Sequence, residues 1–161
     1  MQQGIPPHKL VLGMPIYGRS FMHTDGPGTA FNGIGPGTWE KGTYDYRALP
    51  LPGSHVLHDR QAMASWTYNP QTKEMISFDD EEVVRWKTHW INERGLGGAM
   101  FWELSGDKGS DREGMEKGPG KDPQPGGSLV SIVRHGLGQL DASSNNLDYS
   151  HSQFENLRKG M

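Results

Sequence analysis

The sequence has no cysteine, which excludes disulfide bonds and thiolate metal sites as sources of stability or chemistry. It also lacks a large excess of either charge, because 16 lysines and arginines face 19 aspartates and glutamates. A net charge of −3 favours neither nucleic acid nor an anionic membrane as a partner. No apolar run is long enough to span a membrane, and residues 1–7 lack the apolar core of a signal peptide. From the residues alone we expect a soluble chain with no visible export route.

Glycine and proline are abundant instead: the 23 glycines and 11 prolines make up more than a fifth of the 161 residues. Such a composition indicates many turns. The stretch Gly109–Gly127 has almost no apolar residue, and we expect it to be a mobile surface loop. A chain of this length normally forms one domain, with at most a small appended lobe.

Two short apolar runs predict strands that are buried on both faces, as in a parallel sheet. The first is Lys9–Tyr17, KLVLGMPIY, and the second is Gly97–Leu104, GGAMFWEL. Between them, Met63–Tyr68 and Glu74–Phe78 flank a turn of the sequence NPQTK, which favours an antiparallel hairpin.

The clearest helix is predicted to begin after Asp79, with Glu82 three residues further on at the spacing of a capping box. Arg94 in its last turn and Gly95 after it are typical of a helix end. Its expected packing face comprises Val83, Val84, Trp86, Trp90 and Ile91. A second, shorter helix is expected from Ser128 to about Gly136. The order strand, antiparallel excursion, helix, strand is that of one βα unit with material inserted after the first strand.

Several segments in this order resemble family 18 chitinases, particularly those of the fungal type. The segments KLVLGMPIYGRSF and GLGGAMFWELSGD resemble the seventh and eighth barrel strands of that family. FNGIGPGTWEKGTYDYRAL and MASWTYNPQTKEMISFDD resemble the small domain inserted between those two strands, and LDYSHSQFENLRKGM resembles the C-terminal tail. Apart from the Gly/Pro-rich stretch, the resemblance covers nearly the whole chain.

The resemblance implies an α/β fold that is a partial (β/α)8 TIM barrel with an inserted α+β domain. A complete barrel takes roughly 250 residues, so we expect a C-terminal fragment. The expected division is 1–21 for the seventh-strand region, 22–78 for the insertion domain and 79–108 for the barrel helix and eighth strand. The Gly/Pro-rich loop at 109–127 and the C-terminal helix and tail at 128–161 complete it.

The resemblance also implies substrate-binding roles for four residues. Tyr17 and Arg19 match residues that line the cleft near the cleaved bond, and Glu40 matches an acid that approaches this arginine across the cleft. Trp102 matches the tryptophan that forms the floor of the cleavage subsite, where an indole stacks on a sugar ring. On the residues alone, Trp102 is more simply a core aromatic, and Arg19 and Glu40 are solvated surface charges.

Other aromatic residues carry weaker expectations. Trp86 and Trp90 are expected to be structural, because they fall on the packing face of the predicted helix. Trp39, Trp66 and Phe31 either border the cleft or pack within the insertion domain.

The catalytic motif of the family, Asp-x-x-Asp-x-Asp-x-Glu, does not occur in this sequence. Family 18 enzymes use the substrate's own acetamido group as nucleophile and need a general acid from that motif. Asp107, Asp111 and Glu113 look superficially like part of this motif. No apolar strand leads into them, however, so they are not expected to replace it. The segment Tyr44-Asp45-Tyr46 matches the insertion domain instead of a catalytic strand, and no residue is assigned a catalytic role.

His55 and His58 suggest a metal site only weakly, because Asp59 is the one acid nearby and no third ligand is convincing. We expect surface histidines in a Pro/Gly-rich loop, no metal, and no organic cofactor.

The inherited function is expected to be binding of chitin and, in the complete enzyme, retaining, substrate-assisted hydrolysis of β-1,4-linked N-acetylglucosamine polymers. The parent family implies an extracellular location, and the chain alone is expected to be inactive. One alternative is a non-catalytic, lectin-like module that binds chitin oligosaccharides. Another is a chain without stable independent function that self-associates, because two barrel strands leave unpaired edges.

Overall fold

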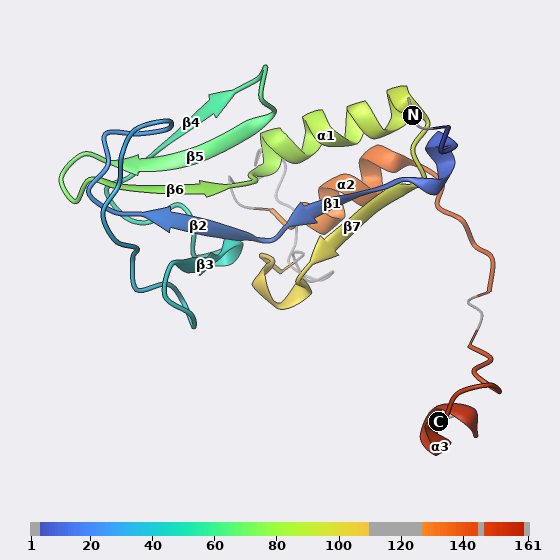
Figure 1. Cartoon of the computed structure of the whole chain (residues 1–161). Helices are drawn as coiled ribbons and strands as arrows, with labels where there is room; N and C mark the ends of the chain where they lie inside the picture. Colours follow the sequence, from blue (N-terminus) through green and yellow to red (C-terminus); the bar gives the residue numbers. More distant parts are fainter. Residues whose placement is uncertain (1–3, 110–126, 145–146, 160–161) are drawn as a thin grey trace, which may run out of the picture.

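The computed structural model describes residues 4–109, 127–144 and 147–159, which form two sheets and three α-helices (Figure 1). Strands β1 (Val11–Pro15) and β7 (Gly98–Trp102) pair in parallel. The second sheet is antiparallel, in the order β3-β2-β6-β5-β4. Its strands are β2 (Tyr17–Phe21), β3 (Thr43–Asp45), β4 (His55–Asp59), β5 (Ala64–Asn69) and β6 (Glu74–Phe78).

The parallel pair is covered on one face by α1 (Glu81–Arg94) and α2 (Leu129–Leu137), which pack against each other (Figure 1). Because side chains alternate along a strand, Leu12 and Met14 point to this face and contribute to the core. The alternate positions, Val11, Met100 and Trp102, are exposed. The sheet thus has one covered and one uncovered face, whereas the continuous apolar runs predicted burial on both.

The strand expected over Lys9–Tyr17 ends at Pro15, and the next strand belongs to the other sheet. Proline has no N–H to continue a ladder. The following residue, Ile16, is buried and joins the two sheets: its N–H donates to the Trp102 carbonyl (2.8 Å), and its carbonyl accepts from the Tyr46 N–H (3.1 Å). The antiparallel sheet therefore begins at Tyr17, inside the range expected for the barrel strand.

The expected hairpin is confirmed, since β5 and β6 pair antiparallel with Thr67 opposite Ile76. Strand β4 was not predicted. It carries His55 and His58, which lie on an edge strand instead of a loop, and all five of its residues are exposed. The β4–β5 pairing thus adds an outer strand whose side chains contribute little to the core.

Helix α1 occurs where predicted, but its N-cap is Asp80 and not Asp79. The Asp80 carboxylate accepts from the N–H groups of Glu82 and Val83, while Asp79 is buried and pairs with Lys87. Burial raises the pKa of Asp79, although its hydrogen bond to Lys87 opposes that shift. Gly95 ends the helix in the left-handed conformation, as predicted.

The core face of α1 is narrower than predicted. Trp86 and Trp90 are only half-buried at its margin, where Arg60 and Arg94 respectively lie against their rings. The residues that are fully buried are Val83, Val84, Thr88 and Ile91.

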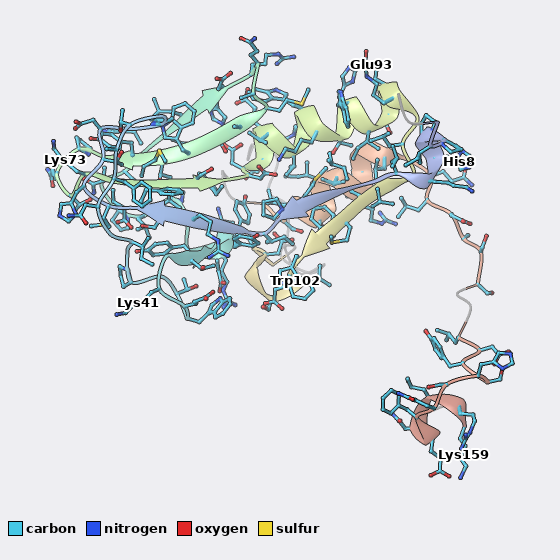
Figure 2. All side chains as sticks on the ribbon, viewed as in Figure 1. His8, Lys41, Lys73, Glu93, Trp102 and Lys159 are labelled. Carbon is cyan, nitrogen blue, oxygen red and sulfur yellow. The ribbon has the colours of Figure 1, made fainter. Side chains whose placement is uncertain are left out.

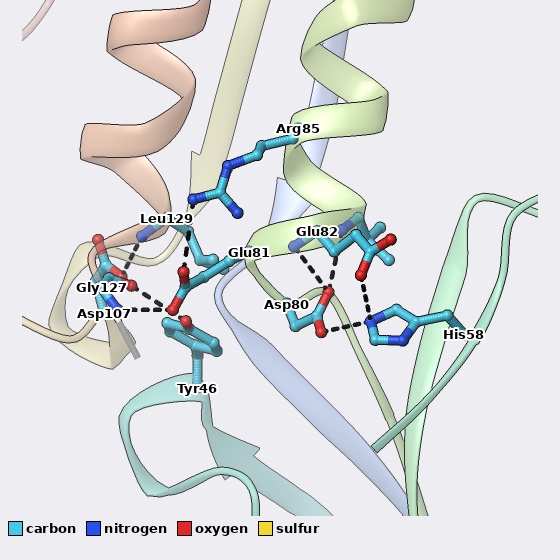
Figure 3. A network of polar contacts seen from close by, with 10 residues as sticks. Tyr46, His58, Asp80, Glu81, Glu82, Arg85, Asp107, Gly127 and Leu129 are labelled. Carbon is cyan, nitrogen blue, oxygen red and sulfur yellow. Dashed lines mark hydrogen bonds and ion pairs between the residues drawn. The ribbon is translucent and has the colours of Figure 1, made fainter. Parts of the chain in front are cut away.

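A polar network joins the N-terminal ends of the two helices (Figure 3). Asp107 accepts from the Ser128 hydroxyl (2.7 Å) and from the Leu129 and Val130 N–H groups, which caps α2. Glu81 accepts from the Gly127 N–H (2.8 Å), and the Tyr46 hydroxyl donates to the Gly127 carbonyl (3.1 Å). Asp107 therefore helps to cap α2, a role that the sequence analysis did not predict.

The tail carries the short helix α3 (Glu155–Arg158) and leaves Leu147, Tyr149 and Phe154 exposed. It extends away from the two sheets (Figure 1). Most of the expected Gly109–Gly127 loop lies outside the described residues. None of the helices within the described ranges is long and apolar enough to cross a membrane.

Replacing Asp107 with alanine should lower the free energy of unfolding by about 1–2 kcal/mol, because three donors at the start of α2 lose their acceptor. Urea unfolding followed by circular dichroism measures this. Asp141→Ala, in an exposed segment, is the control and should change stability by less than about 0.5 kcal/mol. Equal effects of the two substitutions would contradict the capping role.

The stability of the chain should fall as the pH rises above the ordinary tyrosine range. Burial, more than the nearby Glu81 and Asp107 carboxylates, raises the pKa of Tyr46 above its ordinary value of 10.0. Above that value the unfolded chain releases a proton that the folded chain keeps, so the free energy of unfolding decreases with pH.

Tyr46→Phe should cost about 1 kcal/mol near neutrality, for the lost hydrogen bond to Gly127, and this deficit should shrink as the pH rises. Unfolding curves at several alkaline pH values test this, with Tyr149→Phe in the exposed tail as control. A deficit that stays constant would show that Tyr46 does not contribute to the alkaline dependence.

Candidate functional site

The candidate site lies where the carboxyl ends of the two parallel strands meet. Pro15 and Trp102, the last residues of β1 and β7, are register partners, and Tyr17 begins β2 immediately beyond. In barrels and other parallel sheets this edge carries ligand sites. Trp102 projects from the end of β7 on the side away from the two helices (Figure 2).

A pocket of about 170 Å³ opens at this edge, and all four residues expected to contact substrate line it. Its walls come from both sheets and from the loops that join them. The lining residues are Ile16, Tyr17, Arg19, Trp39, Glu40, Thr43, Asp45, Trp102, Glu103 and Gly106.

Arg19 is held in the pocket by its neighbours in the antiparallel sheet. Its Nη1 donates to the Thr43 hydroxyl (2.8 Å), and its guanidinium lies over the Tyr17 ring, 5.3 Å from the centroid. Arg19 and Thr43 are register partners on β2 and β3. The guanidinium therefore has a defined orientation toward the pocket.

Glu40 approaches Arg19, as the resemblance implies, and the two charged groups are connected through Thr43. The Thr43 hydroxyl donates weakly to Glu40 Oε2 (3.4 Å) and accepts from Arg19. Over the ranges that the structure describes, the two charged groups form no ion pair within 4.0 Å. The Thr43 hydroxyl on β3 thus links Glu40 to Arg19, and Glu40 approaches the arginine without a direct ion pair.

The loop that carries Glu40 depends on Gly37, whose φ is 73°. A Cβ at this position would stand 1.9 Å from the Glu40 carbonyl oxygen and 2.5 Å from that of Thr43. Only glycine combines this conformation with so close an approach. The Thr38 N–H then donates to the Thr43 carbonyl (2.9 Å), which closes the loop.

Two tryptophans are exposed in the pocket, Trp102 at the end of β7 and Trp39 in the loop between β2 and β3. Trp102 and Trp39 each leave 69% of their surface accessible to solvent. Of the three aromatics whose place was left open, Trp39 borders the pocket, and Trp66 and Phe31 do not line it. Exposed indoles in a concave site offer apolar faces for stacking.

Asp45 is a pocket residue that the sequence analysis did not select. Its carboxylate accepts from Trp39 Nε1 (2.9 Å) and pairs with Arg47 (2.8 Å). The pocket has three carboxylates, Glu40, Asp45 and Glu103, and that of Glu103 accepts from the Ser105 hydroxyl. Asp45 and Glu103 therefore bind side chains that lie close to them in the sequence.

Of the other acidic and histidine candidates, Asp107, His55 and His58 are described, and none of them lines this pocket. Asp107 caps α2, and Asp111 and Glu113 lie outside the described residues. His58 Nε2 is 2.6 Å from Asp80 Oδ2, at the start of α1 (Figure 3). Within residues 4–109, 127–144 and 147–159, no group of three His, Asp or Glu side chains is placed to hold a metal ion.

The fold and pocket define an α/β protein with a pocket at the carboxyl edge of a parallel strand pair, and comparison with known proteins identifies its family. The model of glycosyl hydrolases family 18 matches residues 1–107. The chain belongs to this family, which confirms the resemblance.

Chitinase 1 of Aphanocladium album is 46% identical over 159 residues, which is 98% of this chain and 34% of that protein. Endochitinase 1 of Metarhizium robertsii is 40% identical, again over 98% of this chain and 34% of the relative. The chain thus spans about a third of the length of these curated relatives.

Solved structures show the same fold. The catalytic domain of the psychrophilic chitinase B from Arthrobacter TAD20 matches with a TM-score of 0.65 at 29% identity, over 84% of this chain and 27% of that one. The class V chitinase from Nicotiana tobaccum matches with a TM-score of 0.65 at 24% identity, over 86% of this chain and 37% of that one. The neighbours are chitinases of the TIM-barrel class, and this chain is mixed α/β.

Replacing Thr43 with valine should lower the free energy of unfolding by about 1 kcal/mol, because Arg19 and Glu40 lose the hydroxyl that both contact. The shape of the side chain is nearly unchanged. Thr72→Val in the exposed turn between β5 and β6 is the matched control and should have almost no effect. If Thr43→Val were equally neutral, the hydroxyl would not link the two charges.

Proposed function

We propose that this chain forms part of the substrate cleft of a chitinase, an enzyme that hydrolyses β-1,4 linkages between N-acetylglucosamine units. The observation that carries the proposal is the pocket at the strand ends, with the exposed Trp102 beside Tyr17 and Arg19. An indole face suits the apolar face of a pyranose, while the surrounding polar groups suit its hydroxyl and acetamido groups. The chitinases among the relatives support this choice of substrate.

Each of three pocket residues has a proposed role that follows from its exposure and its contacts. Trp102 provides the stacking surface, and its exposed indole is free for a ligand. Arg19, oriented by Thr43 and Tyr17, presents its remaining N–H donors to sugar oxygens. Glu40 presents a carboxylate that accepts from sugar hydroxyls in the same pocket.

The chemistry of the family requires a general acid that protonates the leaving oxygen while the substrate's acetamido oxygen attacks the anomeric carbon. We propose that no carboxylate of this pocket is that acid. Asp45 is engaged by Trp39 and Arg47, Glu103 by Ser105, and Glu40 by Thr43. The acid would then belong to the Asp-x-x-Asp-x-Asp-x-Glu motif, which the sequence does not contain.

For the fold, we propose that β1 and β7 are two neighbouring strands of a (β/α)8 barrel and that the five-stranded sheet is an inserted α+β domain. The parallel pairing, the two helices on one face and the exposed Val11 and Met100 on the other support it. In a closed barrel that second face is the interior. The complete enzyme would act outside the cell, where its polymeric substrate lies.

A second candidate function is non-catalytic binding of chitin oligosaccharides, as in a lectin. It is favoured by the combination of Trp102, Tyr17 and Arg19 in one pocket with a sequence that lacks the catalytic motif. Both candidates require the same sugar contacts, and they differ in whether the complete protein supplies an acid.

Titration with the tetramer of N-acetylglucosamine, followed by tryptophan fluorescence, tests the shared requirement. We expect a saturable change, and we expect Trp102→Ala to weaken binding by about tenfold, which corresponds to about 1.4 kcal/mol. Trp90→Phe, at the margin of α1 and outside the pocket, is the control and should bind like the parent. Unchanged fluorescence of the parent at millimolar tetramer would overturn the proposal.

A further inference from the structure

The side chain of Trp39 combines high exposure with a specific anchor. Its indole is 69% exposed, yet Nε1 donates to Asp45 Oδ1 at 2.9 Å. An exposed tryptophan without such a contact would sample several rotamers, and ordering it on ligand binding would cost free energy. The single hydrogen bond to Asp45 therefore decides which way this indole faces.

Asp45 is itself fixed independently of Trp39. It is only 4% exposed and pairs through Oδ2 with Arg47 (2.8 Å), while its N–H donates to the Thr38 hydroxyl (3.1 Å). Gly106 packs close by, and a Cβ there would stand 3.6 Å from Asp45 Oδ1 and 2.5 Å from the Ile16 carbonyl oxygen. Asp45 thus offers a rigid acceptor at the junction of the two sheets.

The backbone beneath Trp39 is held as well. The Thr38 N–H donates to the Thr43 carbonyl (2.9 Å), and Glu40 and Thr43 form an antiparallel bridge. Trp39 lies between Thr38 and Glu40, both of which are anchored to Thr43. Backbone and side chain are therefore both set before a ligand arrives, which is the condition for preorganised binding.

Trp39 and Trp102 border a second cavity, of about 350 Å³, next to the first. Asp45, Arg47, Glu103 and Ser105 complete its lining. No ring contact joins the two indoles in the part of the chain that the structure describes. Because the two indoles do not stack on each other, their faces are available to a ligand.

We propose that Asp45 is a positioning residue that holds the Trp39 indole as a second sugar-stacking wall, so that the site favours oligomers over single sugars. This inference rests on the proposed function, because it assumes that the pocket takes N-acetylglucosamine units. The two cavities adjoin and share Trp39, Asp45, Trp102 and Glu103, which suits a ligand longer than one ring. Trp39 contributes its stacking to the oligomer, and Asp45 acts only through Trp39.

The positioning itself is measured without any sugar. In the full chain with ¹⁵N-labelled indoles, the Nε1–H resonance of Trp39 is assigned by its disappearance in Trp39→Phe. We expect Asp45→Leu to shift this resonance strongly and speed its hydrogen exchange, while the Trp90 indole signal stays in place. An unmoved Trp39 signal in Asp45→Leu would overturn the positioning role, whatever the chain binds.

The consequence for binding is measured by a double-mutant cycle with the tetramer and the monomer of N-acetylglucosamine. Trp39→Ala and Asp45→Leu should each weaken tetramer binding by about five- to tenfold, and the double variant should be no worse than either one. Monomer binding should change little. Asp45→Asn retains an acceptor for Nε1 and should restore most of the tetramer affinity that Asp45→Leu loses.

The outcomes separate the two proposals. If the parent does not bind the tetramer, the proposed function fails, and the indole resonance still decides whether Asp45 positions Trp39. If the parent binds but Trp39→Ala does not weaken tetramer binding, the second wall is wrong while the proposed function stands. Additive losses in the double variant would also contradict the inference, because Asp45 would then act independently of Trp39.

Discussion

The backbone of Ile16 is the contact on which the rest of the structure depends. Its N–H binds the Trp102 carbonyl of one sheet and its carbonyl binds the Tyr46 N–H beside the other, while its side chain is buried. A single residue therefore fixes the distance between the end of β7 and the end of β3. Gly106 packs against the same carbonyl, where a Cβ would stand 2.5 Å from the oxygen. The pocket is the space that remains around this junction.

Most helices and strands of the fold could be predicted from the sequence, but the points where one element ends and the next begins could not. Apolar runs, turn residues and helical spacing predicted β7, the β5–β6 hairpin and both longer helices. The end of β1 at Pro15 was missed because the apolar run continues through Ile16 to Tyr17. Strand β4 has no core face, so it lacked the alternation that predicts a strand.

The start of α1, where either Asp79 or Asp80 could be the N-cap, shows why the ends of elements are hard to predict. Both have the right chemistry, and local spacing even favoured Asp79. The outcome depends on Lys87, two turns into the helix, which pairs with the buried Asp79 and leaves Asp80 to bind the first N–H groups. A tertiary contact thus decides between two residues that local propensity does not distinguish.

The candidate site divides in the same way. Tyr17, Arg19, Glu40 and Trp102 were selected through the family resemblance, and the structure brings them to one pocket, while their roles in binding stay predictions. On their residue types alone, Arg19 and Glu40 would have passed as surface charges. Thr43 and Asp45 gain their places from the β2–β3 register, which no sequence spacing encodes, and Trp39 gains its orientation from its hydrogen bond to Asp45.

The most direct test of this account is hydrolysis of a fluorogenic chitin oligosaccharide by the purified chain, beside its Trp102→Ala variant. Because the pocket is proposed to supply sugar contacts and no general acid, neither protein should release product. Product release by the parent that is lost in Trp102→Ala would contradict it. One of the pocket carboxylates, Glu103, Asp45 or Glu40, would then have to be the acid.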